Sequence, residues 1–473
     1  MKVFSGMRWL SFASILCFLY GTTLTGCPTT TNTEKTSEPT GDGGNHPDGS
    51  GGRTANENCN GKICTLEGKY TNDIELKADT EYLLKGGVFI GQDSKDPSGE
   101  IKATLKIEAG TKIYADTATK TFLTVVRGSK IFAEGTKEKP IIFTSAAEKG
   151  KRAPGDWGGI ILNGKAKLNA GKEAEGEGGT GFYGGEDDAD NSGTLRYLRI
   201  EYGGKQITGT NELNGLALQG VGSATTLEYI QIHMTKDDCV EFFGGTVNFK
   251  YILCTGTQDD GLDWTQGWRG KGQFFISQFY KNAGNHGIEA DNLEDDNTAT
   301  PRSKPILSNL TFIGHPDSAE EGSGMLLRRG TGANISNAVV VGWKTSCFTL
   351  DSSETFKNAW KDGKLSGDLT VTNSYFSCAK FVSEPKPDKV PSPDFKVEDF
   401  LKNLNSDNKT DDPMLTYDPT QDKAPGWLPK EGSPVLSGAK IPSDAFFKQV
   451  SFVGGVGRGA DDWTQGWTTN EEN

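Results

Sequence analysis

The chain has 473 residues, of which 24% are charged and only 34% hydrophobic, and its net charge is −13. This length allows two or three domains or one elongated domain, and the negative charge argues against nucleic acid as a partner because phosphates would be repelled. The 62 glycines favour many short strands and turns over a helical bundle. The same charge is compatible with binding cations or neutral sugars.

The first 26 residues have the pattern of a lipoprotein signal peptide. Lys2 and Arg8 form a basic start, an apolar run follows, and Leu24-Thr25-Gly26-Cys27 matches the bacterial lipobox. We expect cleavage before Cys27, whose thiol would carry diacylglycerol and make the protein a palmitate-bearing membrane-anchored lipoprotein. Pro28 rather than Asp after this cysteine favours the outer membrane. A plain secretory signal or a short membrane anchor is the alternative.

Residues 27–58 are expected to form a disordered tether, because residues 28–58 contain no large apolar side chain. Such a tether would span about 30 Å on average. Residues 59–73 are predicted to cap the folded part.

Six cysteines remain after the signal peptide, and an exported protein meets oxidising conditions. Proximity in the sequence favours three disulfides among the 15 ways of pairing six cysteines, namely Cys59–Cys64, Cys239–Cys254 and Cys347–Cys378. A zinc site is the rival interpretation, but the chain has only four histidines and the spacings do not resemble a zinc finger or ribbon.

From about residue 70 the sequence repeats itself. The stretch 105–116 recurs 18 residues later as 123–134, and further runs of about five β-branched or aromatic residues return every 18–36 residues up to residue 379. Repeats made only of strands and turns predict stacked coils, so that each strand gains a parallel partner about 4.8 Å away. We therefore predict an all-β fold, a right-handed parallel β-helix (solenoid) over residues 74–380. A propeller and a β-sandwich are the alternatives, and the 18-residue recurrence argues against the sandwich.

The C-terminal part lacks this repeat. Residues 381–430 are rich in Pro and Lys and are expected to form an excursion over the last coils, with a short helix at 397–404. Residues 431–473 would be a closing segment. Within it, residues 462–467 repeat residues 263–268 as DWTQGW.

An acidic motif occurs twice, as TKDDCVEFFGGT (235–246) and TQDDGLDWTQGW (257–268). Aligning one strand per coil places an apolar residue at the third position of every repeat, so the fourth must point outward. This alignment stacks Glu241, Asp263 and Glu289 on one outer face. Two positions further on, the same face would carry a second row, which consists of Phe243, Thr265, Asp291 and Arg328. Trp268 is expected beside the acids as a further ligand contact, whereas Trp264 should face inward.

Three carboxylates stacked at this spacing repel one another by roughly 1 kcal/mol per pair in water, and by about 3–4 kcal/mol at an effective dielectric of 20. A bound Ca²⁺, protonation of the middle acid, or Arg328 would offset this repulsion. Glu241, Asp263 and Glu289 are therefore the candidate metal ligands. With Arg328 they are also the candidate catalytic residues, and Phe243, Thr265, Trp268 and Asp291 are the candidate ligand contacts. The competing interpretation is that Asp238 and Asp260 only cap turns and that the other acids are surface copies of a repeat.

Several motifs resemble a known family. VVRGSKIFAEGTKEKPIIFTS, PGDWGGIILNGKA, DDCVEFFGGTVN, DDGLDWTQGWRGKGQF and the final GADDWTQGW are similar to those of exported right-handed parallel β-helix proteins of Gram-negative bacteria, many of them lipoproteins. The resemblance covers about residues 100–380 and 420–467 and implies a β-helix broadly like that of pectate lyases. It implies no activity.

These patterns predict an outer-membrane lipoprotein, periplasmic or surface-exposed, whose rigid β-helix binds an extended partner such as a polysaccharide or a cell-surface protein. One alternative is a Ca²⁺-dependent polysaccharide lyase or hydrolase, and another is a structural component of a surface assembly. Whether the protein is an enzyme stays open at this point.

Overall fold

The fold is known from a computed structural model, which describes residues 58–95, 97–208, 211–281, 283–361, 364–365, 367–385, 395–404 and 407–471. The predicted signal peptide, Cys27 and nearly all of the predicted tether lie outside these residues.

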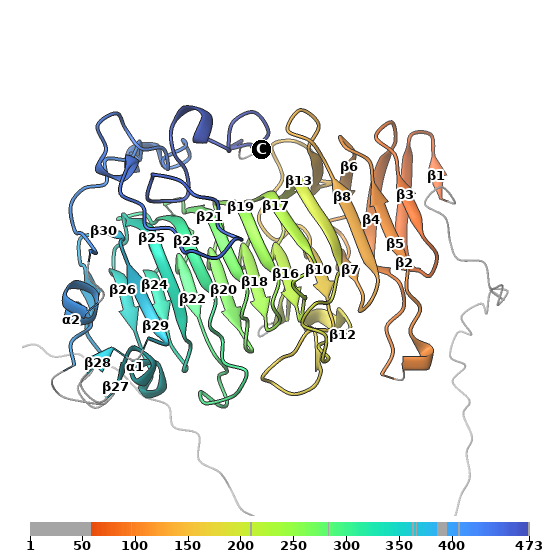
Figure 1. Ribbon diagram of the computed structural model, residues 1–473. Helices are drawn as coiled ribbons and strands as arrows, with labels where there is room; N and C mark the ends of the chain where they lie inside the picture. The colour runs from red at the N-terminus through yellow and green to blue at the C-terminus, as the bar shows by residue number, and fades with distance from the viewer. Residues whose placement is uncertain are drawn as a thin grey trace, which may run out of the picture. The chain divides into compact units, whose positions relative to one another are not determined.

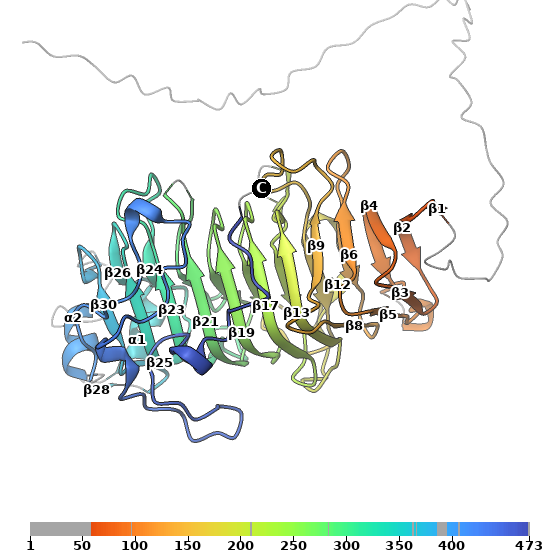
Figure 2. The ribbon, with the colours of Figure 1, turned by 90° about the horizontal axis from the view of Figure 1, so that it is seen from above.

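Strands of successive coils pair in parallel and form three ladders (Figures 1 and 2). The first ladder begins with β3 (Ile74–Leu76), β5 (Thr104–Ile107) and β8 (Lys130–Glu134) and ends with β29 (Leu369–Thr372). The second contains β6 (Lys112–Ala115), β9 (Ile141–Ser145) and β30 (Tyr375–Ser377). Long bent strands contribute their first halves to the first ladder and their second halves to the second, and these are β13 (Gly193–Glu201), β17 (Thr226–His233), β19 (Asn248–Thr255), β21 (Lys271–Gln278), β23 (Ile306–Ile313) and β25 (Ala333–Val341).

The third ladder carries the candidate site. Its strands are β7 (Phe122–Val125), β10 (Ile160–Asn163), β16 (Leu216–Gln219), β18 (Val240–Phe243), β20 (Leu262–Thr265), β22 (Ile288–Ala290), β24 (Ser323–Leu327), β26 (Ser346–Leu350) and β31 (Val382–Ser383). The prediction of a right-handed parallel β-helix is confirmed.

Residues outside the ladders form short elements. The small hairpins are β11 (Ala174–Glu175) with β12 (Phe182–Tyr183), β14 (Gln206–Thr208) with β15 (Asn211–Glu212), and β27 (Trp360–Lys361) with β28 (Lys364–Leu365). The helical elements are α1 (Ser353–Ala359), α2 (Val397–Asp399) continuing as a π-turn (Phe400–Leu404), and 3₁₀ turns at Pro97–Gly99, Glu177–Gly179, Pro419–Gln421, Pro434–Leu436 and Gly459–Asp461. The predicted helix at 397–404 is thereby confirmed.

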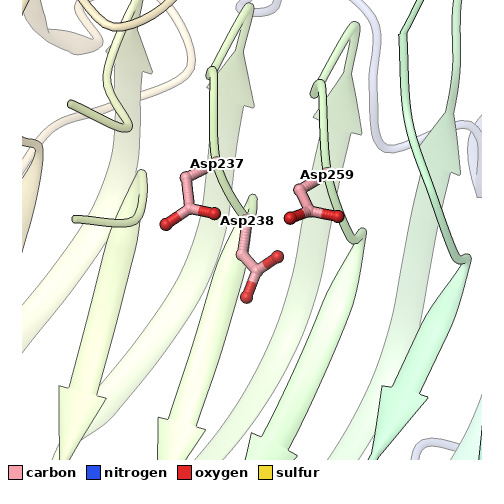
Figure 3. A group of neighbouring side chains, drawn as sticks. All are labelled: Asp237, Asp238 and Asp259. Atoms are coloured by element: carbon pink, nitrogen blue, oxygen red, sulfur yellow. The ribbon is translucent and has the colours of Figure 1, made fainter. Parts of the chain in front are cut away.

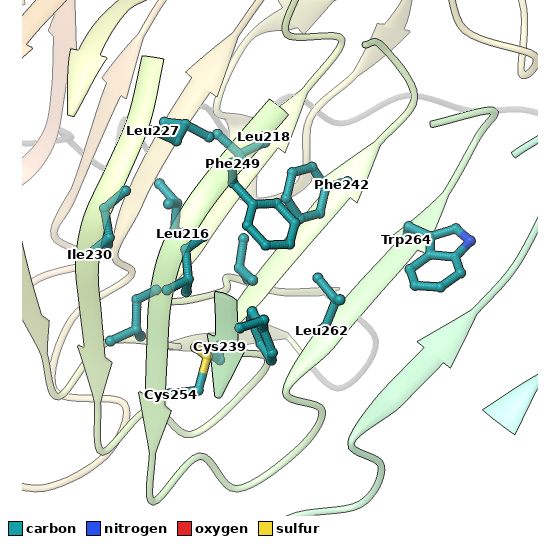
Figure 4. Packing of buried hydrophobic residues seen from close by; sticks show 14 of the residues in the cluster. Leu216, Leu218, Leu227, Ile230, Cys239, Phe242, Phe249, Cys254, Leu262 and Trp264 are labelled. Atoms are coloured by element: carbon teal, nitrogen blue, oxygen red, sulfur yellow. A yellow bond between two sulfur atoms is a disulfide. The ribbon is translucent and has the colours of Figure 1, made fainter. Parts of the chain in front are cut away.

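The core is a column of apolar side chains inside the coils. Leu216, Leu262 and Trp264 are fully buried, and residues of successive coils stack on one another (Figure 4). Each fully buried side chain of this size contributes roughly 1.5–3 kcal/mol. The buried Cys239–Cys254 disulfide joins the residue before β18 to β19, and Cys59–Cys64 and Cys347–Cys378 also form as predicted.

The ends of the β-helix differ from the predicted boundaries. Strand β2 (Ile63–Tyr70) already pairs in parallel with β4 (Glu81–Ile90), so the β-helix begins before residue 74. Strand β1 (Cys59–Asn60) pairs antiparallel with β2 at this end. At the other end, Phe395, Val397 and Phe400 are buried against the last coils, as expected for the excursion. This arrangement covers apolar side chains at the end of the ladders, beyond the last strands that the structure describes.

Residues 437–471 do not close an end of the β-helix. They form a C-terminal strap that runs back along the coils (Figure 2), held by side-chain amides that point outward from the long strands. The Gln273 amide donates to the Lys448 carbonyl at 2.8 Å and accepts from the Lys448 N–H at 2.8 Å, and Gln231 holds Thr469 in the same two-way manner. The strap therefore gains backbone hydrogen bonds without joining a sheet.

Candidate functional site

The three acids predicted to stack do lie in neighbouring coils. Glu241 in β18 pairs in register with Asp263 in β20, which pairs with Glu289 in β22. Their inward neighbours Val240, Leu262 and Ile288 are fully buried. The predicted register is confirmed, because alternation along each strand directs the acids to the outer face.

A second set of acids lies in the turns that lead into these strands. Asp237 and Asp259 occupy equivalent points of adjacent coils, and Asp238 lies between them (Figure 3). Asp238 and Asp260 are 6% and 3% exposed. The carboxylate of Asp238 accepts from the backbone N–H of Asp260 at 3.0 Å, and that of Asp260 accepts from the N–H of His286 at 2.6 Å. The capping interpretation is thus correct for Asp238 and Asp260, and each keeps a second oxygen for other contacts.

The carboxylates converge into three overlapping groups, in each of which one oxygen per residue lies within 4.8 Å of the others. These groups are Asp237, Asp238 and Asp259; Asp238, Glu241 and Asp263; and Asp260, Asp263 and Glu289. The last two are the same arrangement moved by one coil, and Asp263 belongs to both. We call the seven residues the acidic cluster. They are oxygen ligands of the kind that hard divalent cations prefer.

Two arginines neutralise one end of the acidic cluster. The Arg328 guanidinium contacts Glu289 and donates to Asp291 at 2.9 Å, and Arg329 donates to Asp291 at 2.7 Å. Asp291 therefore serves as the partner of two arginines. Among the described residues, none of Asp237, Asp238, Glu241 and Asp263 forms an ion pair with a basic side chain. These four acids are consequently left without a cationic side chain to stabilise their charged forms.

Two polar residues flank the acids in the coils on either side. Asn214 precedes the cluster, is 3% exposed, and donates to Glu241 at 2.6 Å, while its buried Oδ1 has no hydrogen-bond partner among the described residues. His286 follows it, accepts the Ser323 N–H at its Nδ1, and places its Nε2 3.6 Å from Glu289. The ring must therefore carry its proton on Nε2 when it is neutral.

Burial raises the pKa values of the clustered acids, and their mutual repulsion raises them further. The pKa of Asp237 rises to about 8 and that of Glu289 to about 7, and the pKa values of Asp238, Glu241, Asp260 and Asp263 rise well above their usual range. Burial lowers the pKa of His286 to about 4, so its imidazole is neutral at pH 7. Without a cation, the cluster therefore retains protons near neutral pH.

The predicted aromatic contacts need correction. Trp268 is fully buried and its ring stacks on Phe242 at 4.0 Å between centroids, so it is a core residue and not a ligand contact. Phe243 is 8% exposed because Tyr183, in the insertion between β10 and β13, packs against it. Thr265 stays partly exposed on the outer face. Trp264 faces inward, as alternation requires.

The alignment of the repeats predicts three neighbouring acids but does not include Asp237, Asp259 and Asn214 in the site. The repeated Asp-Asp pair was the available signal, because two adjacent residues in a turn point to different sides. The second Asp of each pair, Asp238 or Asp260, accepts a backbone hydrogen bond from the next coil. The first Asp, Asp237 or Asp259, joins the acidic cluster from the side. Asn214 occupies the position of Asp238 and Asp260 in the preceding coil and could have been found from the same alignment.

The chain was compared with known proteins. The model of a family described as a pectate-lyase-like β-helix domain matches residues 68–468. No curated protein and no solved structure matches the chain. In the part of the chain that the structure describes, no helix is long and apolar enough to cross a membrane. The family match spans the three ladders, the acidic cluster and the strap, and the chain therefore belongs to the pectate-lyase-like β-helix family.

Proposed function

We propose that the protein is an exported, lipid-anchored β-helix that binds an extended acidic polysaccharide through divalent cations held by the acidic cluster. The observation that carries this proposal is the convergence of seven carboxylates on adjacent coils, which have arginine partners, among the described residues, at one end only. Ca²⁺ is the cation that suits this set best, because it accepts six to eight oxygen ligands in flexible geometry.

The protein supplies part of a coordination shell. Asp263 belongs to two equivalent carboxylate groups, with Asp238 and Glu241 on one side and Asp260 and Glu289 on the other. The partly exposed acids Glu241, Asp263 and Glu289 leave the outer side of a bound cation open. Carboxylates of an acidic sugar would complete the shell from solvent, so the cation would join two negatively charged partners.

The repeat of the site along the third ladder supports a polymeric ligand. Successive coils present equivalent carboxylate groups about 4.8 Å apart, which matches a ligand that is itself periodic. The family description names pectate lyases, which supports a polysaccharide over a surface protein as the partner. Anchoring through Cys27 would hold the β-helix at the outer membrane, and the tether would let it extend away from the membrane surface.

The experiment is a glycan screen with purified protein lacking residues 1–27, in calcium and in EDTA. We expect binding to uronate-containing polysaccharides in calcium and loss of this binding in EDTA. Asp263→Asn should lose binding, whereas Glu431→Gln, at an exposed acid outside the strands of the third ladder, should bind as the wild type does. Equal binding in calcium and EDTA would contradict the proposal.

One observation favours a second candidate, a polysaccharide lyase or hydrolase. Glu289, whose pKa is about 7, lies 3.6 Å from a neutral His286 and contacts Arg328. An acid that is half protonated near neutral pH can act as general acid or base. New reducing ends or unsaturated products, abolished by Glu289→Gln with retained binding, would establish the enzyme. Their absence with intact binding leaves the binding module.

A further inference from the structure

The outward-facing row that contains Glu241, Asp263 and Glu289 continues along the third ladder on both sides of the acidic cluster. Its other members are Thr124, Ile161 and Ala217 in the preceding coils and Leu326, Thr349 and Ser383 in the following coils. The two sides differ in what covers them. This difference determines how far a chain that lies along the ladder can extend beyond the acids.

The part of the row that precedes the acidic cluster is covered. Thr124 and Ile161 are 0% exposed and Ala217 is 3% exposed, although alternation along their strands directs all three away from the core. Leu168 and Tyr183, from the insertion between β10 and β13, pack with Ile161 and Ala217 in an apolar cluster that is separate from the core. The insertion therefore forms a wall across the outer face, immediately before the acidic cluster.

Hydrogen bonds hold this wall against the ladder. The buried amide of Asn163 in β10 donates to the Thr180 carbonyl at 2.9 Å. The buried Tyr183 hydroxyl donates to the side-chain oxygen of Gln266 at 3.0 Å. Because Gln266 is three positions after Asp263, the wall extends along one side of the acidic cluster as far as the coil of Asp263. The wall is thus a fixed part of the fold.

The part of the row that follows the acidic cluster is accessible. Leu326, Thr349 and Ser383 are partly exposed. The hydroxyls of Thr349 and Ser383 each bond that of Ser346 at 3.0 Å, and a hydroxyl group has further hydrogen-bonding capacity for a ligand. Asp351, two positions after Thr349, is also partly exposed. These coils therefore suit the hydroxyl groups of a sugar better than its carboxylates.

We propose that the site binds one end of a polysaccharide chain, with the first sugars over the acidic cluster, against the wall, and the following sugars over Leu326, Thr349 and Ser383. This inference rests on the proposed function, because cations at the acidic cluster hold the first sugars. The six paired strands from β18 to β31 span about 24 Å at about 4.8 Å per spacing, which accommodates several sugars. An internal segment of the polysaccharide does not fit in the same way, because the chain on its other side would run into the wall.

The test is the number of protein molecules bound per polysaccharide chain. Sedimentation velocity, followed by the absorbance of the protein, measures it for the mature protein in excess over long polygalacturonate, at a calcium concentration that does not aggregate the polymer alone. We expect one protein per chain, whatever the length of the chain. Several proteins on one chain, increasing in number with its length, would overturn this inference and leave the proposed function intact. The absence of any calcium-dependent binding would contradict both.

Substitutions on the two sides of the acidic cluster test the direction of the bound chain. Leu326→Ala and Thr349→Ala should each weaken calcium-dependent binding of hexagalacturonate by about threefold, with unchanged melting temperatures. Lys69→Ala is the matched control, because Lys69 is exposed and lies in the same outward row on the far side of the wall. It should bind as the wild type does. Weaker binding by Lys69→Ala, or unchanged affinity in the Leu326→Ala, Thr349→Ala double variant, would overturn the inference.

Discussion

The carboxylate of Asp238 accepts a hydrogen bond of 3.0 Å from the backbone N–H of Asp260, the residue at the same position of the next coil. Asp260 does the same for His286. One row of side chains therefore fixes the register of the coils and contributes oxygens to the acidic cluster. Turn capping and cation binding are not exclusive interpretations of this motif, because each carboxylate has two oxygens.

Asp263 is the residue shared by both equivalent carboxylate groups, so its charge is the most informative one to remove. We expect Asp263→Asn to stabilise the calcium-free protein at pH 8 by on the order of 1–2 kcal/mol, because a partly buried carboxylate that repels its neighbours is lost. The same substitution should abolish stabilisation by calcium. Thermal denaturation in EDTA and in calcium measures both effects.

Glu431→Gln is the matched control for that substitution, since it removes one negative charge from an exposed position. It should leave the melting temperature in EDTA and in calcium unchanged. If calcium stabilises Asp263→Asn as much as the wild type, the cation does not bind at this cluster.

The pH dependence of stability follows from the raised pKa values. Asp237 and Glu289 have pKa values of about 8 and 7 in the folded protein and about 4 when unfolded, so between these values the folded state binds more protons. Stability without cations should therefore fall as the pH rises from about 4 to 8. Calcium replaces these protons, and its stabilising effect should grow over the same range. Denaturant unfolding at pH 5, 6.5 and 8 tests this, and a calcium effect that is largest at pH 5 would refute it.

Arg328 is the main cationic partner of the cluster, through Glu289 and Asp291. Arg328→Gln should destabilise the calcium-free protein at pH 8 by about 3 kcal/mol, because Glu289 loses its arginine partner while Asp291 keeps Arg329. Calcium should recover part of this loss. Arg328→Lys keeps the charge but not the bidentate contact. Its free energy of unfolding should therefore lie between those of the wild type and of Arg328→Gln. An Arg328→Gln protein as stable as the wild type in EDTA would show that the ion pairs contribute little.

The contribution of the side-chain amides that hold the strap can be tested at Gln273. This residue is fully buried, and its amide bonds both the N–H and the carbonyl of Lys448. Gln273→Ala should cost about 1–3 kcal/mol, because these two groups lose their partner. Hydrogen exchange should accelerate in residues 445–452 while the strands of the third ladder remain protected. Gln258→Ala, at an exposed turn position, is the control. Uniform acceleration throughout the chain would instead mean that the strap and the coils unfold together.

The register of the third ladder could be predicted from the sequence because each coil repeats a small residue followed by an apolar one. Alternation then fixes the outward direction of Glu241, Asp263 and Glu289 without any knowledge of distant contacts. The three disulfide pairings could also be predicted, because each joins cysteines that are near one another in the sequence.

Features built from distant segments could not be predicted in this way. Trp268 lies beyond the end of β20, where alternation no longer applies, and its ring turns into the core. Phe243 is covered by an insertion that has no repeat of its own. The strap is held by amides more than 100 positions away in the chain, as between Gln273 and Lys448. Local patterns carry no information about such contacts.

Cation binding by the acidic cluster is tested most directly by a crystal structure of the mature protein soaked with a divalent or lanthanide ion and measured for anomalous scattering. We expect an anomalous peak within about 2.3–2.6 Å of Asp263 oxygens, shared with Glu241 or Glu289, that disappears in Asp263→Asn. Peaks confined to other parts of the surface, with the acids of the cluster protonated and bonded only to one another, would contradict it.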